Sequence, residues 1–339
     1  RWFLFYWIGV MIGIIWVVLC KGLIYMKIKQ RILITGGAGN IGSSLVRSLI
    51  LDKHNFVVVV DDLSTGSIDN LPSENIDNYD FVKCNVNRKS EIKSVMSSTK
   101  FDVVFHYAAV VGVERTQRYP LKVLEDIEGI KNILNLSLKT GVKKVFYASS
   151  SEVYGEPVHI PQNEITTPLN SRVPYAVVKN VGESFFKSYG KKFGMNYTIF
   201  RFFNTYGERQ NNDFVIPKFL DQALRDEDIS IYGDGSQSRT FLHIDDNIEF
   251  TLKVLKNGGF TNGTVNVGNS YEITIIELAN IIIELLKSKS KIKHMPPLKE
   301  GDMRRRVPDI TEMLKFYNKD LIEIRDGINL LINDRKDKI

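Results

Sequence analysis

Short runs of apolar, β-branched residues alternate with amphipathic stretches through the first part of the chain. The run from Val57 to Val60 is apolar at every position rather than at every second one. Such a strand is buried on both faces, as in a parallel sheet that helices cover on both sides. Each run therefore predicts a parallel strand that a crossover helix joins to the next one. The predicted strands begin at Arg31, Phe56, Phe81, Phe101, Lys143 and Tyr197.

The regular alternation fades after Asn204 into segments rich in glycine and proline, with one long apolar helix predicted over 275–286. We therefore expect an α/β fold with a Rossmann-type, doubly wound parallel sheet over residues 26–203. Residues 204–339 are expected to form mainly a second, smaller α/β domain that binds the substrate, with some segments returning to the first domain. A ligand site is expected between the two domains.

An uncharged apolar run from Phe3 to Cys20 precedes the first predicted strand. It just reaches the length of about 18 residues that a membrane-spanning helix needs. Basic residues follow it, beginning with Lys21, so an anchor here would keep the rest of the chain in the cytoplasm. Alternatively, residues 1–25 are not part of the working protein, because Met26 lies just before the first strand. Both interpretations stay open, and both place the catalytic part in the cytoplasm.

Composition narrows the classes of partner. The net charge of +6 and the pI near 9.0 suit an anionic small ligand, and the basic residues are scattered apart from Arg304, Arg305 and Arg306. No nucleic-acid-binding motif is present, so we expect no nucleic-acid partner. The two cysteines, Cys20 and Cys84, provide neither a disulfide framework nor a cysteine metal site. We expect a reducing compartment and no bound metal.

The stretch "TGGAGNIG" links the first predicted strand to a predicted helix, which is the order that a dinucleotide-binding turn requires. Gly36 or Gly37 permits the tight turn, and Gly39 lets the backbone approach a pyrophosphate. Gly42 lets the helix pack against the strand. The phosphates are then expected at the positive N-terminus of that helix.

A carboxylate follows the second predicted strand. Asp61 ends this strand, where it can accept hydrogen bonds from the hydroxyls of an adenosine ribose. The same charge repels a 2′-phosphate, so the sequence favours NAD over NADP. Asp62 is an alternative for this role.

The stretch "YAVVK" places Tyr175 and Lys179 one turn apart on one face of a predicted helix. Tyrosine is a poor base at its ordinary pKa of about 10. An adjacent ammonium and the positive nicotinamide ring favour its phenolate, which can then take a proton from a sugar hydroxyl. The stretch "ASSSEVYG", at the end of a preceding strand, places hydroxyls at the edge of the sheet where ligands bind.

Seven separated motifs occur in the order seen in extended short-chain dehydrogenase/reductases that act on nucleotide-diphosphate sugars. They are "TGGAGNIG", "HYAAV", "SSSEVYG", "YAVVK", "RFFNTYGERQ", "YGDGSQSRTFLHIDD" and "MRRRVPDI". The chain resembles in particular the sugar-nucleotide 4-epimerases and the UDP-glucuronate decarboxylases. The resemblance runs from about Lys29 to the end of the chain.

The resemblance implies a role for each matching residue. Tyr175 is the base, Lys179 holds the nicotinamide ribose and tunes Tyr175, Ser150 hydrogen-bonds the reacting hydroxyl, and Glu152 assists in acid/base chemistry. The implied NAD site comprises Gly36, Gly39, Asn40, Ile41, Gly42, Asp61, Ala108, Tyr175 and Lys179. The implied substrate site comprises Asn204 and Arg239 with Arg306 on the phosphates, and the backbone near Val215 on the nucleotide base. The substrate is expected to be a UDP-sugar, and the protein a homodimer.

The chain departs from the family pattern at three places. Ser150, Ser151 and Glu152 stand where 4,6-dehydratases carry Thr-Asp-Glu, which argues against a dehydratase. Asn85 replaces an aspartate near the adenine, and Asp126 replaces an asparagine that usually supports the active-site backbone. His106 is expected to pack beneath the cofactor rather than to transfer protons.

The predicted function is an NAD-dependent 4-epimerase of a nucleotide sugar, of the UDP-glucose or UDP-glucuronate type, that acts through a transient 4-keto sugar. The alternative is a UDP-glucuronate decarboxylase that makes UDP-xylose, because both activities share the Ser-Glu pattern and the Arg-x-Pro motif. A third interpretation, a non-catalytic NAD-binding protein, is disfavoured because Ser150, Tyr175 and Lys179 are all present.

Overall fold

The computed structural model describes residues 28–73, 75–297 and 304–336. The apolar segment 1–25 lies outside the described residues, so its two interpretations stay open. Within the described ranges we find no helix that combines the length and the apolar character needed to cross a membrane.

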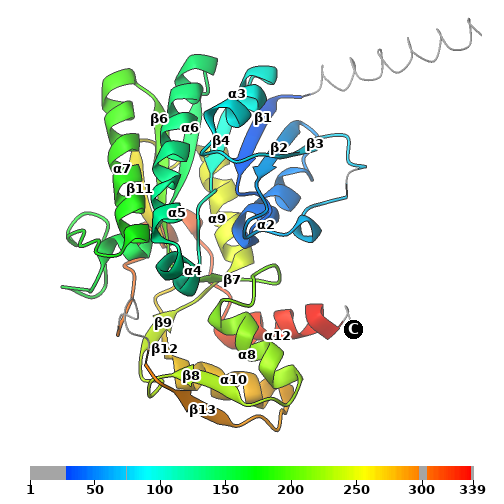
Figure 1. Ribbon diagram of the computed structural model, residues 1–339, viewed down its shortest axis with the longest axis vertical. Helices are drawn as coiled ribbons and strands as arrows, with labels where there is room; N and C mark the ends of the chain where they lie inside the picture. Colours follow the sequence, from blue (N-terminus) through cyan, green and yellow to red (C-terminus); the bar gives the residue numbers. More distant parts are fainter. Residues whose placement is uncertain (1–27, 74, 298–303, 337–339) are drawn as a thin grey trace, which may run out of the picture.

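A seven-stranded parallel sheet forms the centre of the molecule, in the order β11-β6-β5-β4-β1-β2-β3 (Figure 1). Its strands are Gln30–Thr35 (β1), Asn55–Asp61 (β2), Tyr79–Lys83 (β3), Val103–His106 (β4), Lys144–Ser150 (β5), Asn196–Phe202 (β6) and Gly263–Val267 (β11). The first six match the predicted strands, and the predicted Rossmann-type fold is confirmed. The strand order reverses between β1 and β4, and the carboxyl ends of the strands form a crevice at such a switch point.

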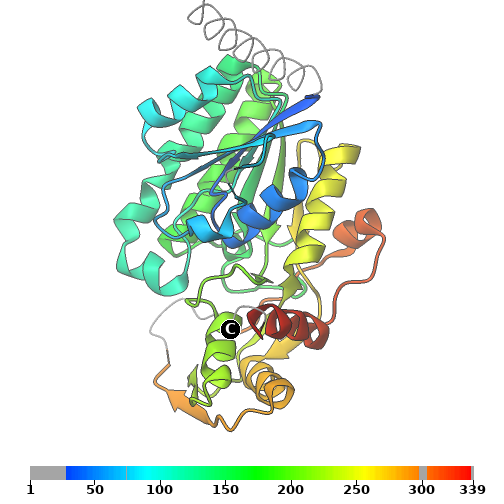
Figure 2. The ribbon, with the colours of Figure 1, turned by 90° about the vertical axis from the view of Figure 1, so that its right-hand side faces the viewer.

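Helices cover both faces of the sheet (Figure 2). One apolar core joins the sheet to Asn40–Leu49 (α2), Ile244–Asn257 (α9) and Thr311–Tyr317 (α11). The second core joins the opposite face to Lys89–Ser98 (α3), Asp126–Thr140 (α6) and Pro174–Phe193 (α7). Burial on both faces explains why the strands are apolar at consecutive positions.

A smaller lobe lies below the carboxyl ends of the strands in Figure 1. It contains the helices Val215–Leu224 (α8), Ile275–Leu286 (α10) and Ile324–Lys336 (α12), which share a third apolar core. Its strands pair as Ile229–Tyr232 (β8) with Ile292–Met295 (β13), and as Ser238–Thr240 (β9) with Glu272–Thr274 (β12). Helix α10 has the predicted bounds and begins with a capping box between Thr274 and Glu277.

Two segments after Asn204 return to the main sheet. Strand β11 pairs in parallel with β6, and α9 packs beside α2. The two-residue strands Thr205–Tyr206 (β7) and Leu242–His243 (β10) pair where the chain passes between the two regions. The smaller lobe is therefore connected to the sheet by several crossings of the chain.

Candidate functional site

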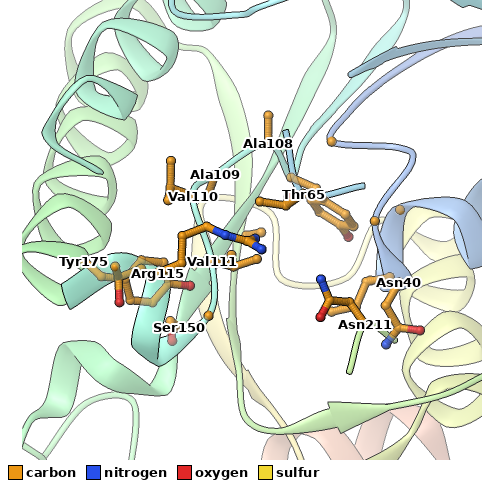
Figure 3. A pocket seen from close by; sticks show the side chains of 18 of the residues that line it. Asn40, Thr65, Ala108, Ala109, Val110, Val111, Arg115, Ser150, Tyr175 and Asn211 are labelled. Carbon is orange, nitrogen blue, oxygen red and sulfur yellow. The ribbon is translucent and has the colours of Figure 1, made fainter. Parts of the chain in front are cut away.

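A cavity of about 870 Å³ lies at the carboxyl ends of the strands and continues toward the smaller lobe (Figure 3). Its lining contains most of the residues that the sequence predicted for the cofactor, the chemistry and the substrate. These are Gly36, Gly39, Asn40, Ile41, Gly42, Asp61, Ala108, Ser150, Glu152, Tyr175, Lys179, Asn204, Arg239 and Arg306. Val215 is the exception. It packs against the core of the smaller lobe, and its neighbour Phe214 lines the cavity instead.

The glycine turn between β1 and α2 has no room for side chains. Gly36 has φ of +70°, a left-handed conformation that favours glycine. A Cβ atom at Gly42 would lie 2.3 Å from the carbonyl oxygen of Gly36, which is far inside van der Waals contact. Helix α2 begins after Gly39 with no side-chain cap and no acidic residue in its first turn. Its N-terminus therefore offers the cavity backbone N–H groups and a positive dipole suited to a phosphate.

Asp61 fixes the glycine turn to the end of β2. Its Oδ2 accepts a hydrogen bond from the backbone of Ala38, and its Oδ1 accepts one from the backbone of Leu63, each at 2.9 Å. Burial raises the pKa of Asp61, although these two bonds oppose the effect. Asp62 also lines the cavity and accepts a hydrogen bond from the backbone of Ser64. Both carboxylates line the cavity and Asp61 is the one tied to the turn, while a bond of either to the ribose stays a prediction.

Tyr175 and Lys179 project from the first turns of α7 toward the end of β5, where Ser150 lies. The Lys179 Nζ atom donates to the carbonyl of Ala148 at 2.7 Å and lies 5.6 Å from the centroid of the Tyr175 ring. A side-chain hydrogen bond with Ser150 lowers the pKa of Tyr175. Hydroxyl, phenol and ammonium groups therefore meet at one end of the cavity.

Burial has the largest effect on the pKa values of Tyr175 and Lys179. It raises the pKa of Tyr175, and the charge of Glu152 raises it further, against the hydrogen bond from Ser150. Burial also lowers the pKa of Lys179 to about 8. Burial therefore disfavours the phenolate of Tyr175 in the protein without a bound cofactor. That the ammonium of Lys179 and the nicotinamide ring together favour the phenolate stays a prediction.

Arg306 lies beside Glu152. Its guanidinium donates to Glu152 Oε1 at 3.0 Å and to the hydroxyl of Ser151 at 3.3 Å, and its side chain is 6% exposed. Its positive charge lowers the pKa of Tyr175. Arg306 thus lies at the Tyr175 end of the cavity and contacts Glu152, and its expected role on the substrate phosphates stays a prediction. Its neighbour Arg305 pairs outside the cavity with Glu272.

The other predicted substrate residues lie on the side of the smaller lobe. Asn204 donates its side-chain amide to the carbonyl of Thr240 at 3.1 Å, and Arg239 donates to the carbonyl of Ser238 at 2.7 Å. Both line the cavity. His106 is 2% exposed and hydrogen-bonds Thr35 at 2.8 Å, while burial lowers its pKa to about 3. It is therefore neutral across the physiological range.

Several cavity residues were not predicted from the sequence, Arg115 and Asn211 among them. Arg115 in Val113–Arg118 (α4) points into the cavity, as does Asn211 (Figure 3). The guanidinium of Arg115 pairs with Asp213 at 2.9 Å, which joins α4 to the loop before α8. Neither residue belongs to one of the motifs, so sequence spacing gave no signal for them.

Comparison with known proteins agrees with this geometry. The model of the NAD-dependent epimerase/dehydratase family matches residues 32–268, which include the glycine turn, Asp61, Ser150, Tyr175 and Lys179. The chain belongs to this family. Its cofactor is accordingly NAD, and the cavity offers the glycine turn and helix N-terminus that a dinucleotide requires.

This member of the epimerase/dehydratase family resembles proteins of two different activities. It is 33% identical over 308 residues to a putative UDP-glucose 4-epimerase of Methanocaldococcus jannaschii, covering 89% of this chain and 97% of that protein. It is 35% identical over 306 residues to a UDP-N-acetyl-α-D-glucosaminuronate decarboxylase of Bacillus cytotoxicus, covering 85% and 93%. A crystal structure of Thermotoga maritima UDP-glucose 4-epimerase with UDP-glucose superposes with a TM-score of 0.85 at 29% identity, covering 91% of this chain and 100% of that one.

Proposed function

We propose that this enzyme is an NAD-dependent 4-epimerase of a UDP-sugar, of the UDP-glucose or UDP-glucuronate type. The observation that carries the proposal is the meeting of Ser150, Tyr175 and Lys179 at the end of the cavity that begins at the glycine turn. The relatives that act on UDP-sugars support this substrate class.

In this proposal Tyr175 removes the proton from the C4 hydroxyl of the sugar, and Ser150 hydrogen-bonds the same hydroxyl. Bound NAD would supply a hydride acceptor for C4, and return of the hydride to the other face of the 4-keto sugar would invert C4. Lys179 donates hydrogen bonds to the nicotinamide ribose and adds positive charge beside Tyr175. Asn204 and Arg239 hold the diphosphate, since amide and guanidinium donors match phosphate oxygens. Tyr175 then returns its proton to the C4 oxygen of the opposite configuration.

A UDP-glucuronate decarboxylase is a second candidate. The buried guanidinium of Arg306 at the Tyr175 end favours it, because this group can bind the carboxylate of a hexuronate. The same first oxidation would give a β-keto acid. Its C5–C6 bond breaks with loss of carbon dioxide, C5 takes a proton, and the C4 ketone is reduced again. The homodimer expected from the sequence stays a prediction under either activity.

The product mass separates the two candidates. We expect that incubation of the NAD-loaded enzyme with UDP-glucose and with UDP-glucuronate gives, for one of them, a product of unchanged mass and changed chromatographic position. An epimerase only inverts a stereocentre, whereas decarboxylation removes the mass of carbon dioxide. Mass spectrometry of the quenched reaction checks this. Loss of carbon dioxide from UDP-glucuronate would replace the epimerase assignment with the decarboxylase.

A further inference from the structure

Lys179 is a buried cation without a direct counter-ion. The residue is 4% exposed, and no salt bridge of Lys179 occurs among the residues that the structure describes. Its contacts are the carbonyl of Ala148 and the rings of Tyr147 and Tyr175, at 5.3 and 5.6 Å from Nζ to the centroids. Desolvation disfavours an ammonium in such surroundings. A negative charge nearby would therefore favour the protonated form of Lys179.

Asp126 supplies a fixed carboxylate in the same cavity. It is the first residue of α6 and is 9% exposed. Its Oδ2 accepts from the backbone of Val110 at 2.8 Å, and its Oδ1 accepts from the side-chain amide of Asn87 at 3.1 Å. Burial raises the pKa of Asp126, while these bonds and the charge of Lys179 lower it. The position at a helix N-terminus further favours its anionic form.

We propose that Asp126 is a positioning residue whose carboxylate holds Lys179 in the ammonium form beside Tyr175. The proposal rests on the proposed function, in which Lys179 acts as a cation. Asparagine, which the resemblance leads one to expect at this position, could accept the bond from Val110 but carries no charge. The charge of Asp126 is the influence that raises the pKa of Lys179 against burial. The same charge raises the pKa of Tyr175.

Other charged and titratable groups around this cluster contribute to its titration. They are Asp62 after β2, His106 on β4, Tyr147 on β5, Glu152 after β5, and Arg306 from the C-terminal segment. Replacement of Asp126 leaves all of them in place. A change in the titration of Lys179 in an Asp126 variant therefore reports the Asp126 charge.

Asp126→Asn is a conservative test because the surroundings can adapt to it. The Asn87 Oδ1 atom is buried and has no hydrogen-bond partner in the described structure. A half-turn of the Asn87 amide brings this oxygen toward the new amide group at position 126, and the bond between the side chains is restored with donor and acceptor exchanged. The variant is thus expected to fold and to bind NAD.

The titration of Lys179 gives a readout that does not depend on activity. The side-chain carbon next to Nζ can be followed by NMR in lysine-labelled protein, with the resonance assigned by its loss in Lys179→Met. We expect a midpoint near pH 8 in the parent protein. In Asp126→Asn we expect a midpoint lower by about one pH unit, the order of effect of removing one charge from the same buried cavity.

The pH profile of turnover is expected to move in the same direction. Turnover in the proposed mechanism needs an ionised Tyr175 and a protonated Lys179, so the pH profile depends on the pKa of both groups. Loss of the Asp126 charge lowers the pKa of both groups, so both limbs move to lower pH. If Asp126 had only a structural role, its replacement would lower the rate of turnover without shifting the pH profile.

Two further variants serve as controls. Glu128→Gln removes a carboxylate from the first turn of the same helix, but Glu128 is exposed and pairs with Lys131, so the Lys179 midpoint should stay unchanged. Asp126→Glu keeps the charge but disturbs the hydrogen bonds, and it should largely preserve the midpoint.

An unchanged Lys179 midpoint in folded Asp126→Asn would overturn the proposal, as would equal shifts in Asp126→Asn and Asp126→Glu. These results do not depend on whether the protein turns over a UDP-sugar. A shifted midpoint in a protein that converts none of them would instead reject the proposed function and leave the coupling between Asp126 and Lys179 established.

Discussion

Replacement of Tyr175 by phenylalanine is expected to lower turnover by about 10³-fold, the range of a lost general base. In the proposed mechanism the phenol oxygen of Tyr175 takes the proton of the C4 hydroxyl. Ser150 hydrogen-bonds Tyr175 but cannot replace it as a base. The phenyl ring fills nearly the same volume, so the fold and NAD binding should be retained. Steady-state kinetics, together with the NAD content of the purified variant, check this expectation.

Tyr189→Phe is a matched control on the same helix. Its hydroxyl donates to Asn135 at 3.0 Å in an exposed position away from the cavity. Turnover of this variant should equal that of the parent. If Tyr175→Phe turned over as fast as Tyr189→Phe, the assignment of Tyr175 as the base would be wrong.

Replacement of Glu183 by glutamine is expected to produce the largest loss of stability. Glu183 on α7 and Arg201 on β6 form a fully buried, bidentate salt bridge, with N–O distances of 2.8 and 2.7 Å. Glu183 also accepts from Ser149, the neighbour of Ser150. Glutamine would leave the guanidinium of Arg201 buried without its counter-charge, at a cost of roughly 3–5 kcal/mol. Unfolding in denaturant, followed by circular dichroism, measures this loss.

Lys187→Met is a control that removes the exposed ion pair of Glu183 and leaves its buried pair with Arg201 in place. Lys187 lies 3.3 Å from Glu183 and its side chain is 48% exposed, so its removal should cost less than about 1 kcal/mol. Equal losses of unfolding free energy for Glu183→Gln and Lys187→Met would show that the buried pair of Glu183 and Arg201 does not stabilise the fold more than the exposed contact does.

The sheet could be predicted from sequence because burial on both faces leaves continuous apolar runs. The return of β11 to the sheet was harder to predict, since Gly263–Val267 is short and follows a region rich in turns. Its partner β6 lies more than sixty residues earlier, so no local pattern indicates the pairing. Tertiary contacts, rather than local preference, determine the place of this strand.

In the candidate site, too, local patterns could be predicted from the sequence and contacts between distant segments could not. The glycine turn, Asp61 and the Tyr175–Lys179 spacing are local patterns, and the structure brings them to one cavity. The pairing of Arg306 with Glu152 joins segments far apart in sequence, so no local pattern indicated it. Likewise, the net effect of burial on Tyr175 depends on surroundings that several elements create.

The transient reduction of bound NAD tests the central claim most directly, because both candidate activities begin with oxidation at C4. NAD-loaded enzyme is mixed with UDP-sugars one at a time, and the absorbance of reduced nicotinamide is followed over time. We predict that at least one UDP-sugar produces a signal that rises and then returns as product forms, and that Tyr175→Phe suppresses it. Bound NAD that stays oxidised with every UDP-sugar and GDP-sugar would contradict the account and indicate a non-catalytic NAD-binding protein.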